Sequence, residues 1–245
     1  MTTSADRGER VRSEVVSFVR RSTRMRSNQR RAWDRHHSEF VIEVPRLETS
    51  TSIHPSARLD LTEAFGREAP LIVEIGPGTG ESLIPMARAR AGDNVLAFEV
   101  YQPAIARILG ALGREQLGNV RLIEADAVAG LRHVLVADSV DELWTFFPDP
   151  WPKVRHHKRR LLSPDFVDLA VSRLKPGGRW RLATDWEDYA DRMRVLLDDH
   201  PRLVNDHDHD QEWGPRWSDR PVSRFEARGI EAGRQIFDLS YSRAR

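Results

Sequence analysis

The feature that most constrains the fold is an alternation of short apolar runs with helical patterns, which begins near Leu71 and continues through most of the chain. Apolar runs that alternate with helices indicate βαβ units and a largely parallel sheet. The apolar runs that we interpret as parallel strands are 71–76, 94–100, 119–127 and 141–147, and segment 179–185, which alternates apolar and polar residues, is the fifth strand. Between the last two strands, SPDFVDLAVSRLKPGG (163–178) combines a serine N-cap, a proline at the first helical position and a Pro-Gly-Gly stop.

Two more segments complete the predicted fold. Segment 81–91 follows the first strand as a helix, although Pro85 removes a backbone hydrogen bond and predicts an early distortion. The last segment, QIFDLSYSR (235–243), alternates apolar and polar residues, as an antiparallel strand at the edge of a sheet does. We therefore predict one α/β domain over residues 61–245, with a mostly parallel twisted sheet, helices on both faces and an antiparallel C-terminal edge strand.

Residues 1–60 have a different character. Apolar side chains are sparse before about residue 34, and arginines crowd one stretch. Such a segment suits a basic arm that becomes ordered against an anionic partner, and equally a solvated, weakly helical tail. We assign residues 1–60 to a basic, partly flexible arm and lead-in. The arginines are Arg20, Arg21, Arg24, Arg26, Arg30, Arg31 and Arg35.

Composition limits the remaining possibilities. The 245 residues are 40% hydrophobic, which is enough to bury a sizeable core, and the net charge of +1 conceals local clusters. The absence of cysteine excludes disulfides and thiolate metal sites. No apolar run is long enough to cross a bilayer or resembles a signal peptide, so we expect a cytoplasmic protein with no membrane partner. The sequence does not distinguish a monomer from a homodimer.

The first apolar run ends in a glycine loop, EIGPGTGE (74–81), at the position where open α/β sheets bind a ligand. Gly76 and Gly78 fit the first two glycines of a dinucleotide fingerprint, but Glu81 occupies the third position. A carboxylate there opposes a pyrophosphate at the helix N-terminus, which argues against NAD. A ligand with a positive sulfonium, an amino-acid end and no phosphate suits this acidic rim better, and S-adenosylmethionine is such a ligand.

Acidic residues recur at the ends of the next two apolar runs. Glu99 is positioned to accept both ribose hydroxyls of a bound nucleoside, and Asp126 to meet its adenine edge. A single acid at a strand end is more often solvated or caps a helix. The ordered recurrence of these acids is what supports a cofactor site.

The loop FFPDPWPKVRHHKRR (146–160) combines a carboxylate, an aromatic ring and a cluster of cations. Prolines on both sides of Asp149 restrict its backbone and hold the carboxylate at the strand end. Trp151 can stack on a base or on adenine, or can plug the loop against the core, which we favour slightly. The cations form a collar at the mouth of the site, where phosphate binding is favoured over a solvated face. They are Lys153, Arg155, Lys158, Arg159 and Arg160.

Three further polar segments have simple alternatives. Segment 206–210 alternates Asp and His, but such a loop is more often solvated than metal-binding, and we expect no metal. Asp185, at the end of the fifth strand, either caps the next helix or contacts a base edge, and we favour the contact. Segment 223–226, before the last strand, is interpreted on its own as a loop that can fold back over the pocket.

These motifs resemble the S-adenosylmethionine-dependent tRNA (guanine-N7)-methyltransferases, which have a Rossmann-like class I methyltransferase fold and modify the variable-loop guanine. The resemblance covers most of the chain, and PDPWPK followed by HHKRR is its most specific part. The glycine loop and LKPGG mark only the wider class I fold. Tyr101 and Ala104 depart from the family pattern, where a histidine and a glycine are usual. The matching segments are SFVRRSTRM, VEIGPGTGESL, FEVYQP, DELWTFFPDPWPKVRHHKRR, LKPGGRWRLATDW, RPVSRFEARG and DLSYSR.

The resemblance implies tRNA as the partner and assigns roles to three groups of residues. The cofactor residues of the family correspond to Glu74, Gly76, Gly78, Glu99, Asp126 and Asp149. Its substrate residues correspond to Lys153, Asp185, Ser223, Arg224, Phe225 and Glu226. Its RNA-contacting basic stretch corresponds to Arg155, His156, His157, Lys158, Arg159 and Arg160.

The implied reaction makes modest demands on the protein. Guanine N7 has a lone pair and no proton, so the transfer needs no general base, and alignment of the reactants contributes roughly 7–11 kcal/mol. A nearby carboxylate favours the cation that develops on the purine, and Asp149 is the candidate catalytic residue.

Two alternatives remain open. An amino-group methyltransferase acting on RNA or DNA usually has Asn or Asp before Pro-Pro and an aromatic residue, a pattern that Pro150-Trp151 breaks. The other alternative is a tRNA-binding module without turnover. The intact acids Glu99, Asp126 and Asp149 argue against it.

Overall fold

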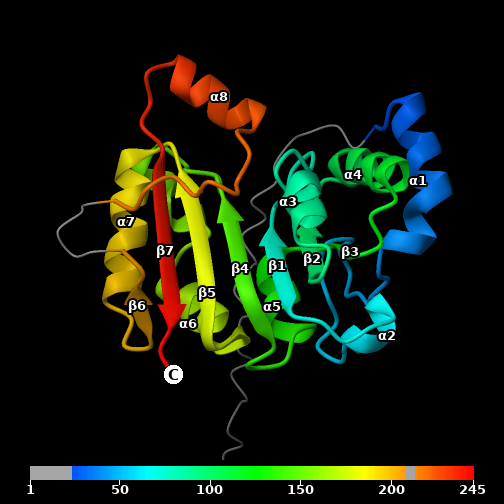
Figure 1. The fold of residues 1–245 in the computed structure, drawn as a ribbon, viewed down its shortest axis with the longest axis horizontal. Helices are drawn as coiled ribbons and strands as arrows, with labels where there is room; N and C mark the ends of the chain where they lie inside the picture. The colour runs from blue at the N-terminus through cyan, green and yellow to red at the C-terminus, as the bar shows by residue number, and fades with distance from the viewer. Residues whose placement is uncertain (1–23, 208–212) are drawn as a thin grey trace, which may run out of the picture.

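The computed structural model describes residues 24–207 and 213–245, and within them a seven-stranded sheet has the order β3-β2-β1-β4-β5-β7-β6 (Figure 1). The first five strands in this order are parallel, β7 is antiparallel to β5, and β6 is antiparallel to β7. The strands are β1 (Leu71–Ile75), β2 (Asn94–Glu99), β3 (Val120–Glu124), β4 (Val140–Phe146), β5 (Leu174–Thr184), β6 (Leu203–Asn205) and β7 (Phe237–Arg243).

Helices cover both faces of the sheet because both faces of the central strands are apolar. Neighbouring residues of β1 point in opposite directions: Ile72 packs with α1, α3 and α4, whereas Val73 packs with α5, α6 and α7. None of the helices within the described residues is long and apolar enough to cross a membrane. The helices are α1 (Ser27–Phe40), α2 (Leu61–Phe65), α3 (Leu83–Ala89), α4 (Gln102–Glu115), α5 (Ala127–His133), the 3-10 helix η1 (Val154–Arg159), α6 (Pro164–Arg173), α7 (Glu187–Asp198) and α8 (Arg224–Glu231).

This architecture confirms the predicted fold class. The C-terminal strand β7 is antiparallel as predicted, but the prediction that it lies at the edge is wrong, because β6 pairs with its outer side. The Ser163 hydroxyl accepts a hydrogen bond from the Phe166 N–H and so caps α6 as expected. Helix α3 begins at Leu83, so Pro85 lies in the first turn, where its missing N–H has no intrahelical partner to lose. The three-residue β6, which pairs outside β7, was not predicted because half-exposed residues such as Val204 leave no apolar run.

Residues 24–60 pack on the same sheet as the rest of the described chain. Helix α1 lies against α4, and the Ile42 N–H donates to the Leu122 carbonyl at 2.8 Å, so this segment joins the edge of β3. Phe40 and Ile53 are buried in the core. Residues 1–23, with Arg20 and Arg21, lie outside the described residues, and the division at residue 60 stays a prediction.

Gly130 in α5 gives a test of how closely this helix packs. A Cβ at this position would lie 2.3 Å from the ring of Phe98, which is buried in β2. We expect Gly130→Ala to lower the free energy of unfolding by about 1–3 kcal/mol through overpacking, although alanine favours a helix by about 1 kcal/mol. Urea unfolding monitored by circular dichroism measures the change. Gly118→Ala, whose Cβ meets nothing within 4 Å, should stay within about 0.5 kcal/mol of the wild type, and a stabilised Gly130→Ala would contradict the packing.

Candidate cofactor and RNA site

The glycine loop turns away from β1 directly over the end of β2. Gly76 and Gly78 have φ values of 66° and 57°, in the left-handed region that favours glycine. A Cβ at either position would meet nothing within 4 Å, so the backbone conformation, not crowding, requires glycine here. The Gly76 N–H donates to the Phe98 carbonyl at 2.9 Å, which joins the loop to β2.

The Glu99 carboxylate organises this loop. It accepts hydrogen bonds from the backbone N–H groups of Gly78, Val100 and Tyr101, each at 2.9 Å. The side chain is buried at the carboxyl end of β2. Glu99 therefore fixes the glycine loop and stands where the sequence predicted a ribose contact. Tyr101, one of the two departures from the family pattern, contributes its backbone N–H to these bonds and not its side chain.

Glu74 lies next to Glu99 in the sheet and has the most unusual environment of the site. It is 3% exposed, and its Oε2 atom has no hydrogen-bond partner among the described residues. Burial, and then the neighbouring charge of Glu99, raise the pKa of Glu74 from 4.5 to about 8. A buried carboxylic acid beside a second carboxylate provides a place for a cationic ligand group.

Asp126 lies two residues beyond the carboxyl end of β3, the strand next to β2. Its Oδ1 atom accepts from the N–H groups of Val128 at 2.9 Å and Ala129 at 3.3 Å, so it caps α5. Its own N–H donates to the Thr51 carbonyl. The capping alternative for this residue is thus present in the structure. An adenine contact stays a prediction.

The loop after β4 holds Asp149 between two residues with left-handed backbones. Phe147 has φ 51° and Trp151 φ 44°, values that are uncommon for aromatic residues and cost on the order of 1–3 kcal/mol each. The Phe147 N–H donates to the Ala183 carbonyl at 2.7 Å, which ties the start of the loop to β5. Asp149 itself is exposed. Two strained residues therefore bracket the Pro-Asp-Pro segment that the sequence singled out.

Trp151 packs within its own loop. Its ring meets the edge of His156 at a centroid distance of 5.8 Å, and the Arg159 guanidinium lies 4.9 Å from the ring centroid. The indole Nε1 is buried without a hydrogen-bond partner among the described residues. These contacts favour the interpretation of Trp151 as a plug over that of a ring free to stack on a base.

The cationic collar divides into exposed and buried members. Lys153, Arg155 and Lys158 are exposed on or beside η1 and make no ion pair with another described residue. Partial loss of hydration, and then the positive charges around it, lower the pKa of His156, so this ring adds little charge at neutral pH.

Arg160 differs from the other members of the collar. It is 8% exposed, its Nε donates to the Pro150 carbonyl at 2.8 Å, and its guanidinium pairs with Asp188 and lies over the Tyr189 ring. His157 lies 3.8 Å from the same Asp188 carboxylate. Arg160 therefore braces the loop from inside, and we leave it out of the proposed RNA surface.

Asp185 is buried at the carboxyl end of β5. It does not cap α7, whose N-cap residue Trp186 makes no side-chain capping bond. Instead its Oδ2 atom lies 3.0 Å from the Arg234 Nε, in an orientation that forms an ion pair but not a hydrogen bond. The guanine-edge contact for Asp185 stays a prediction.

Helix α8 connects the glycine loop to the Asp149 loop, and it lies above the carboxyl ends of the parallel strands (Figure 1). The Arg224 backbone N–H donates to Glu81 at 2.7 Å and its side chain pairs with the same carboxylate. Although partial burial opposes ionisation, the bonds and charge of Arg224 lower the pKa of Glu81. On the other side, the Phe225 ring lies 5.4 Å from that of Phe147. Segment 223–226 therefore folds back over the site, but it forms the start of a helix and not the loop that the sequence suggested.

A buried ionic network anchors α8, and the sequence prediction missed its centre. Ser223 caps the helix by accepting from the Glu226 N–H at 3.1 Å. The Glu226 carboxylate is fully buried and accepts from Arg216 at 2.8 Å and Arg220 at 2.6 Å. Arg220 also donates to both oxygens of Asp238 in β7, at 3.0 and 2.9 Å. Glu226 is therefore engaged within the protein, and its predicted substrate contact is not supported by this geometry.

Arg220 reaches the Asp149 loop as well. Its guanidinium, which is fully buried, lies 5.4 Å from the Phe146 ring centroid and 5.2 Å from that of Phe147. One side chain thus contacts β7, α8 and the first residues of the loop. A sequence does not distinguish a buried arginine from an exposed one. Only the short separation of Arg220 from Glu226 along the chain could have indicated this network.

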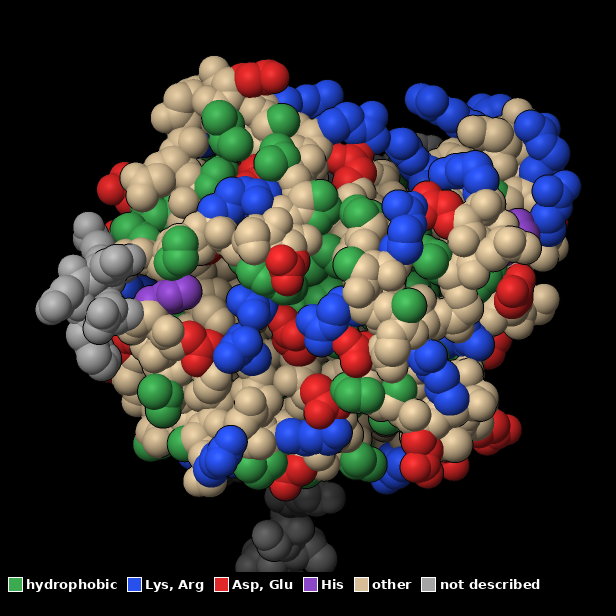
Figure 2. Space-filling model, viewed as in Figure 1, with side chains coloured by type: hydrophobic (Ala, Val, Ile, Leu, Met, Phe, Trp, Pro, Cys, Tyr) green, Lys and Arg blue, Asp and Glu red, His purple; other side chains and the backbone are tan. Residues whose placement is uncertain are grey.

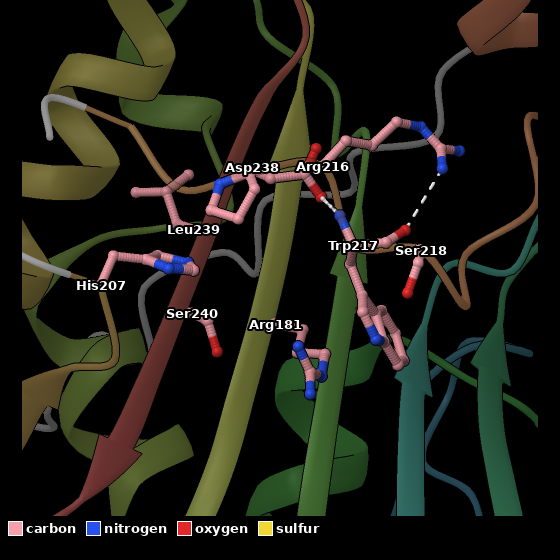
Figure 3. A pocket seen from close by; sticks show the side chains of 9 residues that line it. Arg181, His207, Arg216, Trp217, Ser218, Asp238, Leu239 and Ser240 are labelled. Carbon is pink, nitrogen blue, oxygen red and sulfur yellow. Dashed lines mark hydrogen bonds between the residues drawn. The ribbon is translucent and has the colours of Figure 1, made fainter.

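A small open hollow of about 200 Å³ lies beside this network, on β5 and β7 (Figure 3). Figure 3 shows Trp217 over the strands, and its backbone N–H donates to Oδ1 of Asp238 at 3.3 Å. The Arg181 guanidinium stacks on the Trp217 ring at 4.0 Å. None of the residues lining this hollow belongs to the predicted site. No cluster of potential metal ligands occurs within residues 24–207 and 213–245, and Asp208, His209 and Asp210 lie outside them.

The environment of Glu74 predicts an unusual pH dependence of stability. The unfolded chain ionises Glu74 near pH 4.5 and the folded protein near pH 8. Between these values the folded state holds a proton that the unfolded state has lost, so this contribution to stability falls as the pH rises. We expect Glu74→Gln to be more stable than the wild type by about 1–3 kcal/mol at pH 8 and to lose this slope. Urea unfolding from pH 5 to 9 tests it, with the exposed Glu68→Gln as control; identical slopes for wild type and Glu74→Gln would contradict the assignment.

The Arg220 network predicts a contrast between two arginines. Arg220→Met leaves Glu226 and Asp238 buried without their shared partner, so we expect a loss of about 3–5 kcal/mol in the free energy of unfolding. Arg216→Met, whose side chain is 33% exposed, leaves Glu226 paired with Arg220 and should cost about 1 kcal/mol or less. Chemical denaturation of both variants measures the difference, and equal losses would show that the network is not centred on Arg220.

Comparisons with known proteins identify the family of the chain. A family model described as a putative methyltransferase matches residues 68–239. The chain is similar to the tRNA (guanine-N(7)-)-methyltransferase of Cutibacterium acnes, with 51% identity over 96% of this chain and 86% of that protein. It is similar to the proteins of the same name from Nocardioides sp., with 44% identity over 96% and 90%, and from Burkholderia thailandensis, with 41% identity over 94% and 82%. Among solved structures, an SAM-dependent O-methyltransferase of Thermotoga maritima has 20% identity and a TM-score of 0.48 over 73% of this chain and 60% of that one. The chain belongs to the tRNA (guanine-N(7)-)-methyltransferase family.

Proposed function

We propose that this enzyme transfers the methyl group of S-adenosylmethionine to N7 of the variable-loop guanine of tRNA, in the cytoplasm. The observation that carries the proposal is a row of acids at the carboxyl ends of neighbouring parallel strands. Glu99 is the last residue of β2, Glu74 is the last but one of β1, and Asp149 follows β4. The parallel register of these neighbouring strands brings their carboxyl ends together. The glycine loop and α8 lie at the same end of the strands.

The residues at this end of the strands suit the cofactor. S-adenosylmethionine supplies a methyl group activated by a sulfonium. The unpartnered acid of Glu74, beside Glu99, matches a ligand that carries two positive groups, and the left-handed glycines leave open space where a side chain would stand. Because Glu74 has a raised pKa, a bound cation would favour its ionised form. In the proposal, Glu99 accepts the ribose hydroxyls and Asp126 the adenine edge.

Asp149 acts on the guanine side. The N7 lone pair attacks without losing a proton, so the protein contributes position and charge. The carboxylate of Asp149, held on a loop bracketed by Phe147 and Trp151, stabilises the positive charge that develops on the purine. This loop and α8 meet at the rings of Phe147 and Phe225, so the two walls of the proposed guanine site are in contact.

The RNA backbone binds to the exposed part of the collar. Lys153, Arg155 and Lys158 project into solvent beside Asp149, where phosphates of the variable loop can reach them. Asp185, Arg224 and Phe225 complete the substrate side of the site in the proposal.

A nucleoside-level assay tests the reaction itself. Labelled S-adenosylmethionine and unmodified tRNA should yield 7-methylguanosine, which mass spectrometry identifies and cleavage after reduction and alkali maps to the variable loop. Methyl groups on exocyclic amines would instead support an amino-group methyltransferase. Absence of any methylated nucleoside would support a binding module.

We expect Asp149→Ala to lower kcat by on the order of 10²–10³, because one preorganised electrostatic contact to the transition state is lost. Asp149→Asn, which keeps the shape but removes the charge, should lose nearly as much. Dissociation constants for tRNA, measured by filter binding, should change little in both variants. Asp191→Ala, which removes an exposed carboxylate from α7, is the matched control. A near-normal rate for Asp149→Ala would exclude it as the catalytic residue.

A further inference from the structure

A second strongly basic surface lies on α1, apart from the collar. Figure 2 shows Lys and Arg side chains gathered over α1 and continuing along the upper edge of the view toward α8. Five exposed arginines belong to residues 24–40, against the acids Asp34 and Glu39. They are Arg24, Arg26, Arg30, Arg31 and Arg35. Arg30, Arg31 and Arg35 make no ion pair with another described residue.

This surface contains a groove between α1 and α4, which we name the α1–α4 groove. It has a volume of about 420 Å³. Its floor is made of small residues that allow the two helices to approach closely: a Cβ on Gly113 would lie 2.3 Å from the His36 ring, and one on Gly110 would lie 3.3 Å from Ala32. The groove is lined by Asn28, Arg31, Ala32, Arg35, His36, Gly110, Gly113 and Arg114.

The groove begins near the carboxyl ends of the parallel strands, where the candidate site lies. Gln29, in the first turn of α1, donates to the Pro103 carbonyl at 2.8 Å, and Pro103 starts the helix that follows Glu99. Ten residues separate Pro103 from Gly113, which is roughly 15 Å along a helix. The cations Arg31, Arg35 and Arg114 therefore extend away from the site along α1 and α4.

The chemistry of the groove suits phosphodiesters. Its polar side chains are three arginines, an asparagine and a histidine, all of which can donate hydrogen bonds, and its lining contains no carboxylate. Arginine binds phosphate oxygens through paired N–H groups. An RNA backbone is the anion that the proposed substrate brings to this end of the molecule, and phosphate contacts position a nucleic acid without reading its bases.

Resting on the proposed function, we propose that the α1–α4 groove is a second tRNA contact, which binds backbone phosphates of a segment other than the variable loop. The groove holds the body of the tRNA while the collar and α8 hold the target guanine. Contacts at two places fix the angle at which the variable loop enters the site.

A matched pair of charge variants tests this surface. The groove variant is Arg31→Gln, Arg35→Gln, Arg114→Gln, since glutamine keeps helix propensity. The control is Arg132→Gln, Arg192→Gln, Arg202→Gln, which removes the same charge from exposed residues outside the groove. We expect the groove variant to bind tRNA about 10-fold or more weakly, with the slope of log K against log salt flatter by about 2–3, and to keep S-adenosylhomocysteine binding. The control should keep wild-type affinity.

The outcomes separate the two proposals. If the wild type methylates tRNA and the groove variant binds it with unchanged affinity and salt slope, the groove is a solvated helix face and the inference is wrong. Equal losses in both triple variants would also overturn it, because general attraction would then explain the effect. A wild type that neither binds nor methylates tRNA would overturn the proposed function first.

Tethered cleavage locates the RNA segment. The chain has no cysteine, so Asn28→Cys gives a single attachment point in the groove for an iron chelate that generates hydroxyl radicals. We expect cuts in a tRNA segment away from the target guanine. Arg132→Cys, outside the groove, should give background cuts only. Cuts from Asn28→Cys that match this background, or that fall only beside the target guanine, would exclude a second contact.

Discussion

The buried pair of Glu74 and Glu99 is the interaction on which the rest of the site depends. Two carboxyl groups at the ends of adjacent parallel strands repel one another when both are ionised, and burial leaves little water to screen them. The ionised carboxylate of Glu99 is stabilised by hydrogen bonds from three backbone N–H groups, and these bonds shape the glycine loop. Glu74 has no such donors at Oε2 among the described residues and keeps its proton to about pH 8. The carboxyl ends of β1 and β2 therefore carry buried acids that suit a cationic ligand group, which distinguishes this glycine loop from the phosphate-binding form.

The guanine side of the site is held in place from a distance. Arg220 links Glu226 of α8, Asp238 of β7 and the Phe147 ring at the start of the Asp149 loop. Arg160 braces the other end of that loop through the Pro150 carbonyl. Left-handed backbones such as that of Phe147 persist only where surrounding contacts enforce them. The position of Asp149, the proposed catalytic residue, therefore depends on two arginines that lie buried in the fold.

The sequence predicted most of the fold because its signals are local. Strands β1 to β4 contain apolar runs, residues 179–184 of β5 alternate apolar and polar side chains, and the cap of α6 is a serine followed by a proline, so each can be recognised from a few residues. The start of β5 at Leu174 was not recognised, because the Pro-Gly-Gly segment was interpreted as the stop of the preceding helix. The docking of α1 could not be predicted in this way, because it depends on Gly110 and Gly113 in a helix far along the chain. Within the site, the acids at strand ends were recognisable from their spacing. The roles of Arg160 and Glu226 were not, because burial decides whether a charged residue meets the ligand or the protein, and no local pattern reports it.

Burial also divides the arginines of this protein into two classes with different physical consequences. Arg160 and Arg220 have exchanged water for carboxylates and aromatic rings, so their charges are compensated inside the fold and change its stability when removed. Arg31, Arg35 and Arg155 remain exposed, so their charges extend into solvent and act on a polyanion before contact. Salt screens the second class within about 10 Å at 0.1 M but hardly reaches the first. A nearly neutral chain can therefore present basic surfaces on α1 and beside Asp149, because several of its acids pair with buried arginines or are buried at the carboxyl ends of the parallel strands.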